Sequence, residues 1–337
     1  MEDTSYVLPL RWRDDASLDG LTGYLRRLAK TAEVIVVDGS LEQLFENHRA
    51  AWGAHVRHVR PDPRRRARMG KVAGVLTGVE LASNERVVIA DDDVRYDPEP
   101  LARVATLLGD ADLVWPQNYF DPLPWHALWD TGRTLINRAL SHDYPGTVAV
   151  RRSLLLAAGG YDGDVMFENL ELRRTIEAAG GRVDTPHDLY VRRLPPTTGH
   201  FLSQRVRQAY DDLALPLRMS AFLSVLPALG AAATRKRWTA IAAAAAGVVA
   251  LAEYGRRKDG GRLVFPARAS AFAPAWVLER GVTSWIVLWE RFARGGVAYG
   301  ETRIRSAATS RRVLRRMIDA RGHAQPDSDS ARRICSA

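Results

Sequence analysis

Three consecutive carboxylates, Asp91, Asp92 and Asp93, are the residues whose type and spacing point most clearly to chemistry. They directly follow the apolar run 87–90, so they stand at the end of an expected buried strand. Three adjacent negative charges repel one another unless a cation lies among them, and carboxylate oxygens are the ligands that Mg²⁺ and Mn²⁺ prefer. A solvated acidic turn is the alternative. The position after a buried strand favours a metal site, which would in turn hold a diphosphate.

Further polar residues could complete such a site, although each one alone has an ordinary structural explanation. Asp38 follows the β-branched run 34–37, where an aspartate commonly caps the next helix. Lys71 begins an expected helix and could meet a phosphate there, or could be a solvated surface residue. Glu168 and Glu171 lie three residues apart on one face of an expected helix. They could supply a base, or they could simply be favoured by the helix dipole.

A basic group precedes the most apolar part of the chain. It contains Gln204, Arg205 and Arg207. Arginines two residues apart with an aromatic residue nearby could grip a pyrophosphate, since guanidinium groups bind phosphate oxygens in a bidentate way. An ordinary basic helix that leads into the apolar region is the alternative.

The first half of the chain alternates short apolar runs with helix-like stretches, which predicts an open, largely parallel α/β sheet. Ligands of such sheets bind at the carboxyl ends of the strands, where Asp38 and Asp91–Asp93 both lie. The segment 115–124, rich in proline and aromatic residues, is expected to be irregular. The expected strands are 6–10, 34–37, 56–59, 87–90 and 148–150, and the expected helices are 18–28, 41–52, 70–82, 125–140, 153–158 and 167–179.

Residues 213–292 are much more apolar than the rest of the chain. The stretch 213–233 carries only Arg218 as a charge, 239–252 carries none, and a basic tripeptide, 235–237, lies between them. The first stretch is long enough to span a bilayer, but the basic connection conflicts with the positive-inside tendency, so a re-entrant or interfacial helix pair fits best. A buried helical hairpin in a soluble domain is the alternative. Tryptophans suited to a belt at headgroup level follow; they are Trp276, Trp285 and Trp289.

The composition restricts the partner and the compartment. The 337 residues carry 48 basic and 39 acidic side chains, a net charge of +9, which favours an anionic partner such as a phosphorylated substrate or anionic lipid. No nucleic-acid-binding motif accompanies the arginines, so nucleic acid is not expected. The single cysteine, Cys335, excludes a disulfide framework and a cysteine-based zinc site. The acidic N-terminus is unlike a secretory signal, which predicts a cytoplasmic catalytic domain.

The order of these motifs resembles that of the family 2 glycosyltransferases of GT-A fold, and within them the membrane-associated, ceramide-glucosyltransferase-like branch. The motifs cover roughly residues 5–212, and 213–310 resembles the branch by pattern only. The resemblance implies an open mixed sheet flanked by helices, and an inverting enzyme that uses a nucleoside-diphosphate sugar. It also implies that Asp38 contacts the nucleobase and that Asp91 and Asp93 hold Mg²⁺ or Mn²⁺. The other donor-binding residues would be Lys71, Asp92, Gln204, Arg205 and Arg207.

Two positions depart from the family pattern. The family signature has a tryptophan where this chain has Gln208, and it usually has an aspartate, the general base, where this chain has Asn169. Because asparagine cannot accept a proton at useful pH, three explanations stay open. Glu168 could be the base, with Glu171 as the second choice; the protein could have lost activity; or the acceptor could be an already ionised phosphate monoester such as a polyprenyl phosphate.

The sequence thus predicts a GT-A catalytic domain over 1–212, an apolar helical membrane-associated region over 213–300, and a basic tail over 301–337 that is disordered from about Gly322. The expected function is that of a hexosyltransferase, which moves a sugar from a nucleoside-diphosphate sugar to a lipid or lipid-linked acceptor at the membrane. A catalytically inactive, membrane-attached sugar-nucleotide-binding protein and a polyprenyl-phosphate glycosyltransferase are the alternatives.

Overall fold

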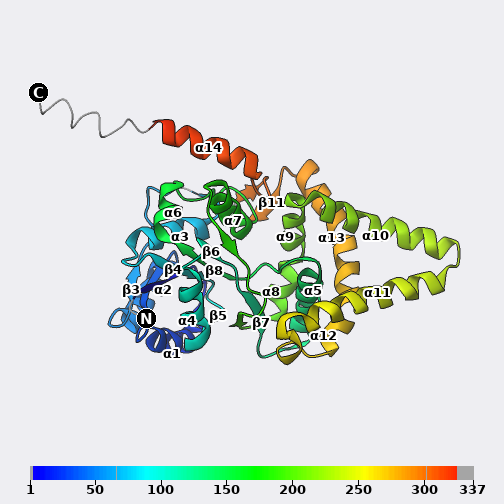
Figure 1. The fold of residues 1–337 in the computed structure, drawn as a ribbon, viewed down its shortest axis with the longest axis horizontal. Coiled ribbons are helices and arrows are strands. Elements are labelled where there is room, and N and C mark those ends of the chain that lie inside the picture. Colours follow the sequence, from blue (N-terminus) through cyan, green and yellow to red (C-terminus); the bar gives the residue numbers. More distant parts are fainter. Residues whose placement is uncertain (1–2, 66, 301, 325–337) are drawn as a thin grey trace, which may run out of the picture.

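A central mixed sheet between helical layers dominates the computed structural model, which describes residues 3–65, 67–300 and 302–324 (Figure 1). Strands β3, β2, β1 and β4 run parallel, whereas β8 is antiparallel to both β4 and β6. The sheet is therefore less parallel than the strand–helix alternation predicts. In spatial order its strands are β3 (Arg57–Val59), β2 (Glu33–Asp38), β1 (Thr4–Leu10), β4 (Arg86–Ala90), β8 (Thr147–Arg151), β6 (Leu113–Val114) and β9 (Val183–Asp184).

Helices cover both faces of this sheet because its central strands carry apolar side chains on both sides. Val7 and Ile35 belong to the core on one face, and their neighbours Leu8 and Val36 belong to the core on the other. Helix α3 (Gly70–Leu81) packs so closely on β1 that a Cβ atom at Gly78 would clash with the Val7 side chain. The helices of this half are α1 (Leu18–Leu28), α2 (Glu42–Trp52), α3 (Gly70–Leu81), α4 (Pro98–Leu107), α6 (Arg152–Ala157) and α7 (Glu168–Ala178).

The segment 115–124, predicted to be irregular, contains strand β7 (Gln117–Phe120), so that prediction was wrong. β7 pairs in parallel with β10 (Tyr190–Arg193), which pairs with β5 (Val94–Arg95) in a second, three-stranded sheet. The Asn118 side chain fixes this arrangement, because its Nδ2 donates to the Val191 carbonyl (3.0 Å) and its Oδ1 accepts from the Gly146 N–H (2.7 Å). Such polar pairing leaves no apolar periodicity in the sequence.

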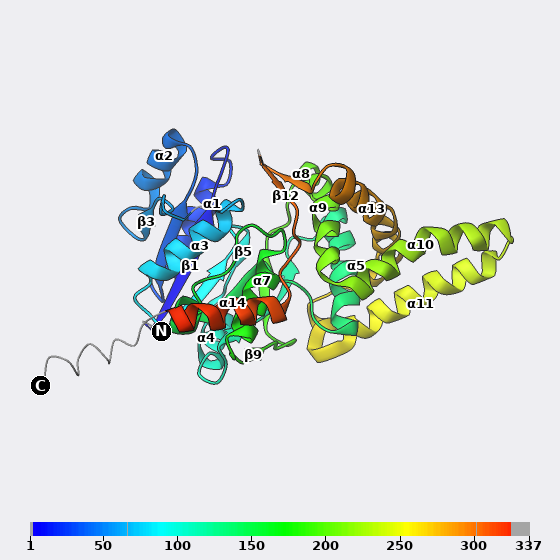
Figure 2. The ribbon, with the colours of Figure 1, turned by 90° about the horizontal axis from the view of Figure 1, so that it is seen from above.

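Two apolar helices, α10 (Pro216–Thr234) and α11 (Trp238–Arg257), form a hairpin that projects away from the sheet (Figures 1 and 2). The base of the hairpin rests on α5 (Trp125–Leu140) and α13 (Ala273–Ala293). Both hairpin helices are long and apolar enough to cross a membrane, and only 6% and 11% of their most apolar windows are buried. The hairpin is therefore exposed, which argues against a buried hairpin in a soluble domain.

The three tryptophans of α13 do not form one belt. Trp276 is completely buried and its ring packs edge-on against Phe222 at 5.3 Å, so the prediction of a headgroup-level belt was wrong for this residue. Trp285 and Trp289 are 46% and 63% exposed. Of the three, Trp285 and Trp289 are therefore the ones exposed enough to meet lipid headgroups.

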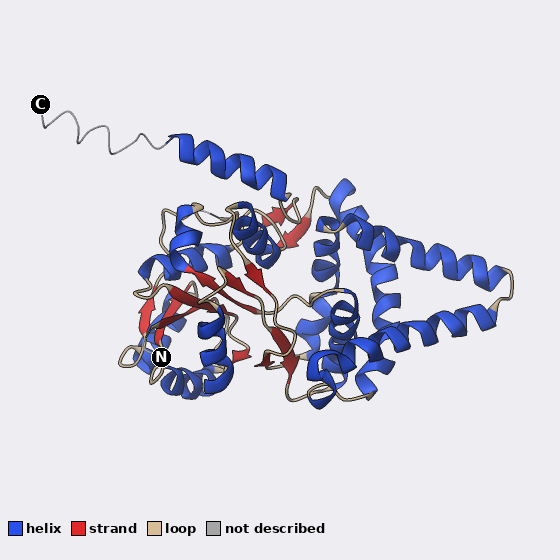
Figure 3. Cartoon of the chain, in the orientation of Figure 1, coloured by secondary structure: helices blue, strands red, loops and turns tan. Residues whose placement is uncertain are grey.

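The described part of the tail returns to the half of the molecule that contains the central sheet (Figure 3). Strand β12 (Thr302–Ile304) pairs with β11 (Val297–Tyr299), and helix α14 (Arg311–Ala324) packs against α7. The disorder expected from about Gly322 falls almost wholly on residues 325–337, which lie outside the described residues, as does Cys335.

Candidate functional site

A polar pocket of about 350 Å³ opens at the carboxyl end of β4. Its wall combines the end of this strand with residues of α3, α7, β10 and α9 (Arg205–Tyr210), so elements far apart in the sequence meet here. Its acidic lining residues are Asp91, Asp92, Asp93, Glu168, Asp211 and Asp212, and its basic ones are Lys71, Arg133, Arg193, His200, Arg207, Arg218 and Arg280.

Lys71 links two of the predicted acidic residues. Its Nζ lies 2.5 Å from Asp91 Oδ1 and 2.5 Å from Glu168 Oε1. Burial lowers the pKa of Lys71, but the carboxylates of Asp91 and Glu168 more than compensate and hold that pKa above its usual value. The lysine therefore stays charged at the start of α3, where the sequence places it.

Arg193, which the sequence analysis missed, holds the other side of the aspartate cluster. Its Nε donates to both oxygens of Asp93, at 2.9 and 2.8 Å, and its Nη2 lies 3.4 Å from Asp91 Oδ2. Burial, together with the neighbouring carboxylates Asp91 and Asp92, raises the pKa of Asp93 to about 6 despite this arginine. Arg193 ends β10, a strand that the sequence pattern did not reveal.

The residues around Asp91 fit a divalent metal ion. Of the four carboxylates of Asp91–Asp93 and Glu168, all but that of Asp92 form ion pairs with Lys71 and Arg193 among the described residues. Arg207 adds a further positive charge near Asp91, so four negative charges meet three positive ones. The raised pKa of Asp93 has this same cause in part. Carboxylate oxygens at the end of a strand suit Mg²⁺ or Mn²⁺, and Asp91 and Asp93 would be the ligands.

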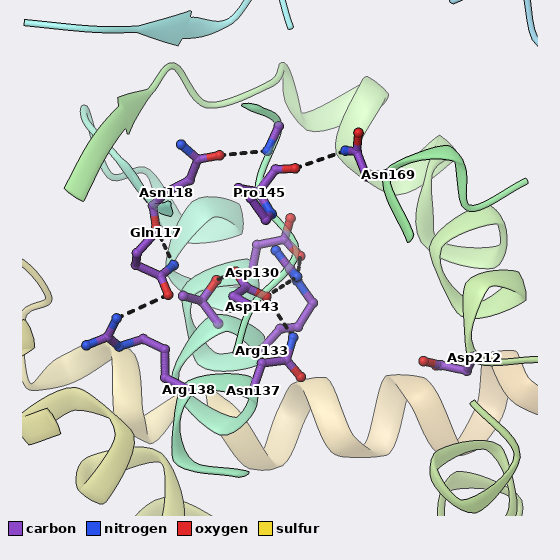
Figure 4. A network of polar contacts seen from close by, with 12 residues as sticks. Gln117, Asn118, Asp130, Arg133, Asn137, Arg138, Asp143, Pro145, Asn169 and Asp212 are labelled. Atoms are coloured by element: carbon purple, nitrogen blue, oxygen red, sulfur yellow. Dashed lines mark hydrogen bonds and ion pairs between the residues drawn. The ribbon is translucent and has the colours of Figure 1, made fainter. Parts of the chain in front are cut away.

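The loop opposite Asp91 is held by a buried network (Figure 4). Asp143 accepts hydrogen bonds from Arg133, Thr134 and Asn137, each at 2.7 Å. The Gly146 carbonyl, three residues further on, accepts from the Asp91 N–H at 2.9 Å. The network thus holds the loop that contains Gly146, and the hydrogen bond to this loop positions the Asp91 backbone.

Asp38 lies outside this pocket, in a buried cluster of its own. Its Oδ1 accepts from the Ser40 N–H (2.9 Å), and its Oδ2 lies 2.6 Å from His48 Nδ1 and 3.0 Å from His58 Nε2. Burial raises the pKa of Asp38, but these hydrogen bonds more than compensate and hold it well below its usual value. Both oxygens are engaged and the residue is fully buried, so its placement does not support direct contact with a nucleobase. The ligand atoms of Asp38, His48 and His58 lie within 4.8 Å of one another, and their mutual hydrogen bonds account for that proximity.

The two glutamates proposed as bases are both engaged elsewhere. Glu168 lines the pocket, but Lys71 takes its Oε1 and the Asn169 N–H donates to its Oε2 at 2.7 Å. Glu171 is buried away from the pocket lining and accepts from the Thr309 N–H at 2.6 Å. The geometry thus favours neither as the base.

Asn169 lines the pocket and acts as a hydrogen-bond donor. Its Nδ2 donates to the Pro145 carbonyl at 3.0 Å, and Figure 4 shows the side chain turned toward this residue. A carboxylate could not make this contact because it has no proton to donate. The departure from the family pattern therefore has a structural use at this position.

The basic motif near residue 205 divides into a structural and a pocket-facing part. Arg205 is buried and pairs with Asp130 at 2.8 Å, and Gln204 bonds Ser203; neither lines the pocket, so the structure does not place them at a donor. Arg207 does line the pocket, with its guanidinium 5.6 Å from the Tyr299 ring centre. Among the described ion pairs, none involves Arg207, which leaves its charge available for a phosphate.

Asp211 and Asp212 were missed because they follow the motif and precede the apolar region. Asp212 pairs with Arg218 at 2.8 Å and lies 3.7 Å from Arg280. Asp211 lines the pocket one helical turn after Arg207, and its buried Oδ1 has no hydrogen-bond partner in the described part of the chain. The spacing of four residues from Arg207 is the signal that could have drawn attention to it.

The chain matches no protein-family profile and no curated protein. Among solved structures it is similar to the mannosyltransferase PcManGT from Pyrobaculum calidifontis in complex with GDP-Man and Mn²⁺, with a TM-score of 0.52 and 20% identity over 86% of this chain and 88% of that one. Weaker similarity, with a TM-score of 0.43 and 20% identity over 62% and 78% of the two chains, extends to glucosyl-3-phosphoglycerate synthase from Mycobacterium tuberculosis. The likeness to the mannosyltransferase shows that this chain has the GT-A fold that the sequence predicts.

Proposed function

We propose that this protein is an inverting hexosyltransferase that uses a nucleoside-diphosphate sugar. The observation that carries the proposal is the juxtaposition of Asp91 and Asp93 with the guanidinium of Arg207, which forms no ion pair with the described residues, in one pocket at the carboxyl end of β4. This arrangement offers an anionic site for a metal ion beside a cation for a diphosphate. The mannosyltransferase described above aligns with 86% of this chain and holds GDP-Man and Mn²⁺. That complex supports the same chemistry here.

Asp91 and Asp93 would hold Mg²⁺ or Mn²⁺, and Arg207 would contact the donor diphosphate. The bound ion would offset the negative charge that develops on the leaving nucleoside diphosphate. Lys71 keeps the Asp91 carboxylate oriented, and Arg193 does the same for Asp93. Asp92, to which the Trp12 indole N–H donates, would lie beside the donor.

We propose further that the sugar acceptor is a lipid or lipid-linked molecule presented at a membrane, with the catalytic domain on the cytoplasmic side. The α10–α11 hairpin supports this, because its helices are apolar and only 6% and 11% of their most apolar windows are buried. A 19-residue helix is about 28 Å long at 1.5 Å per residue, which is close to the thickness of a bilayer core. The basic residues 235–237 at its tip favour a re-entrant or interfacial placement, which keeps them beside the anionic headgroups of the cytoplasmic leaflet.

The activity is tested by release of nucleoside diphosphate from a panel of sugar nucleotides that includes GDP-mannose and UDP-glucose. The full chain is incubated with Mn²⁺ and a membrane lipid extract, beside the Asp93→Ala variant. Lipid-dependent release that the variant abolishes supports the proposal. Donor binding without release would instead favour the catalytically inactive binding protein, an alternative that Asn169 at the usual base position motivates.

Membrane attachment is tested by flotation with vesicles of phosphatidylcholine and phosphatidylglycerol. The double variant Ala243→Glu and Ala246→Glu places charges on exposed positions midway along α11, and each buried charge costs about 2.5–3.5 kcal/mol at the centre of a bilayer. We expect the variant to lose flotation. The matched control, Ala50→Glu on the exposed side of α2, should float like the unmodified chain. Equal flotation of the double variant would contradict insertion of the hairpin.

A further inference from the structure

The proposed reaction lacks an evident proton acceptor, because the residue at the usual base position is Asn169. Its side-chain N–H already donates to the Pro145 carbonyl, so the position serves the fold. If the acceptor is a neutral hydroxyl, another group in the pocket must take its proton.

The carboxylates of the pocket differ in what occupies their oxygens. Glu168 is held by Lys71 and by the Asn169 N–H. Asp212 forms ion pairs with Arg218 at 2.8 Å and Arg280 at 3.7 Å, although its Oδ2 accepts no hydrogen bond from the described residues. The Asp91–Asp93 cluster faces Lys71 and Arg193 and would hold the metal ion. Asp211 forms no ion pair within the described chain, and its Oδ1 is buried without a hydrogen-bond partner.

Asp211 is positioned by the same short helical segment that carries Arg207. It begins the 3₁₀ turn η1 (Asp211–Ala214) directly after α9, four residues beyond Arg207, and both residues line the pocket. The charged groups that act on Asp211 are Arg207, Asp212, Glu168 and Arg280, which come from α9, η1, α7 and α13. A donor diphosphate on Arg207 would therefore lie within one helical turn of this carboxylate.

The electrostatic environment keeps the proton affinity of Asp211 high. Burial raises its pKa to about 8, with the charges of Asp212 and Glu168 adding to the effect and those of Arg207 and Arg280 opposing it. A general base is most effective when its pKa lies near the working pH, since it then both exists as a carboxylate and binds the proton firmly.

We propose that Asp211 is the general base of the proposed transferase and that its acceptor is a neutral hydroxyl. The acceptor O–H gives its proton to the Asp211 carboxylate while the acceptor oxygen uses its electron pair to bond sugar C1. The bond from C1 to the diphosphate oxygen breaks, and the nucleoside diphosphate leaves with that electron pair. The proton passes to solvent after the products depart. This inference rests on the proposed function, and it replaces Glu168 and Glu171 as candidates.

The charge pattern of the pocket agrees with a neutral acceptor. Arg133, Arg193, Arg218 and Arg280 are each paired with a carboxylate, which leaves Arg207 for the donor. An already ionised phosphate acceptor would need a second free cation and no base. Among the described lining residues, Arg207 is the arginine without an ion pair, and Asp211 is the carboxylate outside the metal cluster without one, which is the opposite combination.

The test uses Asp211→Asn with the sugar nucleotide that the unmodified chain turns over, Mn²⁺ and the membrane lipid extract. Sodium azide is added as a second acceptor, because azide is already an anion and attacks C1 without giving up a proton. Donor binding is measured by calorimetry for each variant. Asp19→Asn, an exposed carboxylate of α1, is the matched control. The pH dependence of kcat/KM is recorded for the unmodified chain.

We expect Asp211→Asn to lose about 10²- to 10⁴-fold in transfer to the lipid extract, the range that general-base catalysis supplies. Its donor affinity should be unchanged, and azide should restore nucleoside-diphosphate release. The unmodified chain should gain activity as pH rises to about 8, because its carboxylate must lose a proton to act.

Three results would overturn the assignment. Full activity of Asp211→Asn would mean that no base, or another base, operates. Loss without azide rescue, with donor binding intact, would mean that the carboxylate acts only through the shape of the pocket. A flat pH profile between 6 and 9 would contradict the assignment without any substitution. If the unmodified chain releases no nucleoside diphosphate from any donor, the proposed function fails instead.

Discussion

Asp38 and the Asp91–Asp93 cluster lie at the ends of two strands of one sheet, yet they differ in burial and in how far their charges are neutralised. Asp38, after β2, is fully buried and its oxygens are satisfied by Ser40, His48 and His58. The cluster after β4 opens into the pocket and keeps more negative charge than Lys71 and Arg193 neutralise. The Asp38 cluster stabilises the fold, whereas the Asp91–Asp93 cluster carries excess negative charge that a bound cation can neutralise.

The difference teaches that an aspartate at the end of a strand is not a binding residue by position alone. The partners decide its role, and they come from elsewhere in the chain. His48 lies on α2 and His58 on β3, whereas Lys71 lies on α3 and Arg193 on β10. Substitutions at the two sites should therefore change different measured quantities.

The largest expected effect is that of Asp93→Ala on activity. Loss of this carboxylate removes a metal ligand, and we expect nucleoside-diphosphate release to fall by at least about 10²-fold, as for other groups that stabilise developing charge. The measurement is release with Mn²⁺ and lipid extract. Asp110→Ala, at an exposed position outside the pocket, should behave like the unmodified chain. If Asp93→Ala kept more than a tenth of the unmodified rate, the metal-binding role of Asp93 would be contradicted.

The next effect is that of Asp38→Ala on stability. The substitution leaves two buried histidines without their shared acceptor, so we expect the free energy of unfolding to fall by about 3 kcal/mol. Denaturant unfolding measures this change. Donor affinity of the folded variant should stay within about two-fold of the unmodified value, since Asp38 lies outside the pocket. A large loss of donor affinity with intact stability would show that Asp38 serves binding after all.

Acid should affect the Asp38 cluster in a defined direction. Its folded-state pKa lies below the unfolded value, so its carboxylate contributes stability above about pH 4 that is lost as the pH falls further. Unfolding free energies measured between pH 6 and 3 should decline more steeply for the unmodified chain than for Asp38→Ala. Parallel curves would contradict a stabilising role of the ionised carboxylate.

Glu171→Gln should give the smallest effect. The glutamine can still accept the Thr309 N–H, so we expect a loss of at most about 1 kcal/mol in unfolding free energy. Nucleoside-diphosphate release should not change because Glu171 does not line the pocket. A loss of release beyond about ten-fold, or 1.4 kcal/mol, would restore Glu171 as a catalytic candidate.

The sequence predicts the local features of this fold better than its long-range contacts. The β-branched run before Asp38 and the apolar run before Asp91 become β2 and β4, and Lys71 begins α3 as expected. Each of these depends on neighbouring residues. Strand β7 was missed because Gln117 and Asn118 are buried through side-chain hydrogen bonds, which leave no apolar period.

The site shows the same limit. The pairing of Arg205 with Asp130 joins residues 75 positions apart, and nothing in the local motif distinguishes Arg205 from the pocket-facing Arg207. Trp276 likewise faces Phe222 on another helix rather than a membrane surface. The sequence motifs could not predict roles that depend on such distant partners, but they did identify the acidic cluster itself.

Calorimetric titration of UDP and GDP, with and without Mn²⁺, tests the central claim most directly. The full chain, Asp93→Ala and folded Asp38→Ala are compared at one pH. We expect Mn²⁺-dependent binding of one nucleotide to the full chain, its loss in Asp93→Ala and its retention in Asp38→Ala. Equal binding by Asp93→Ala and the full chain, or loss of binding confined to Asp38→Ala, would contradict the assignment of the pocket at the end of β4 as the donor site.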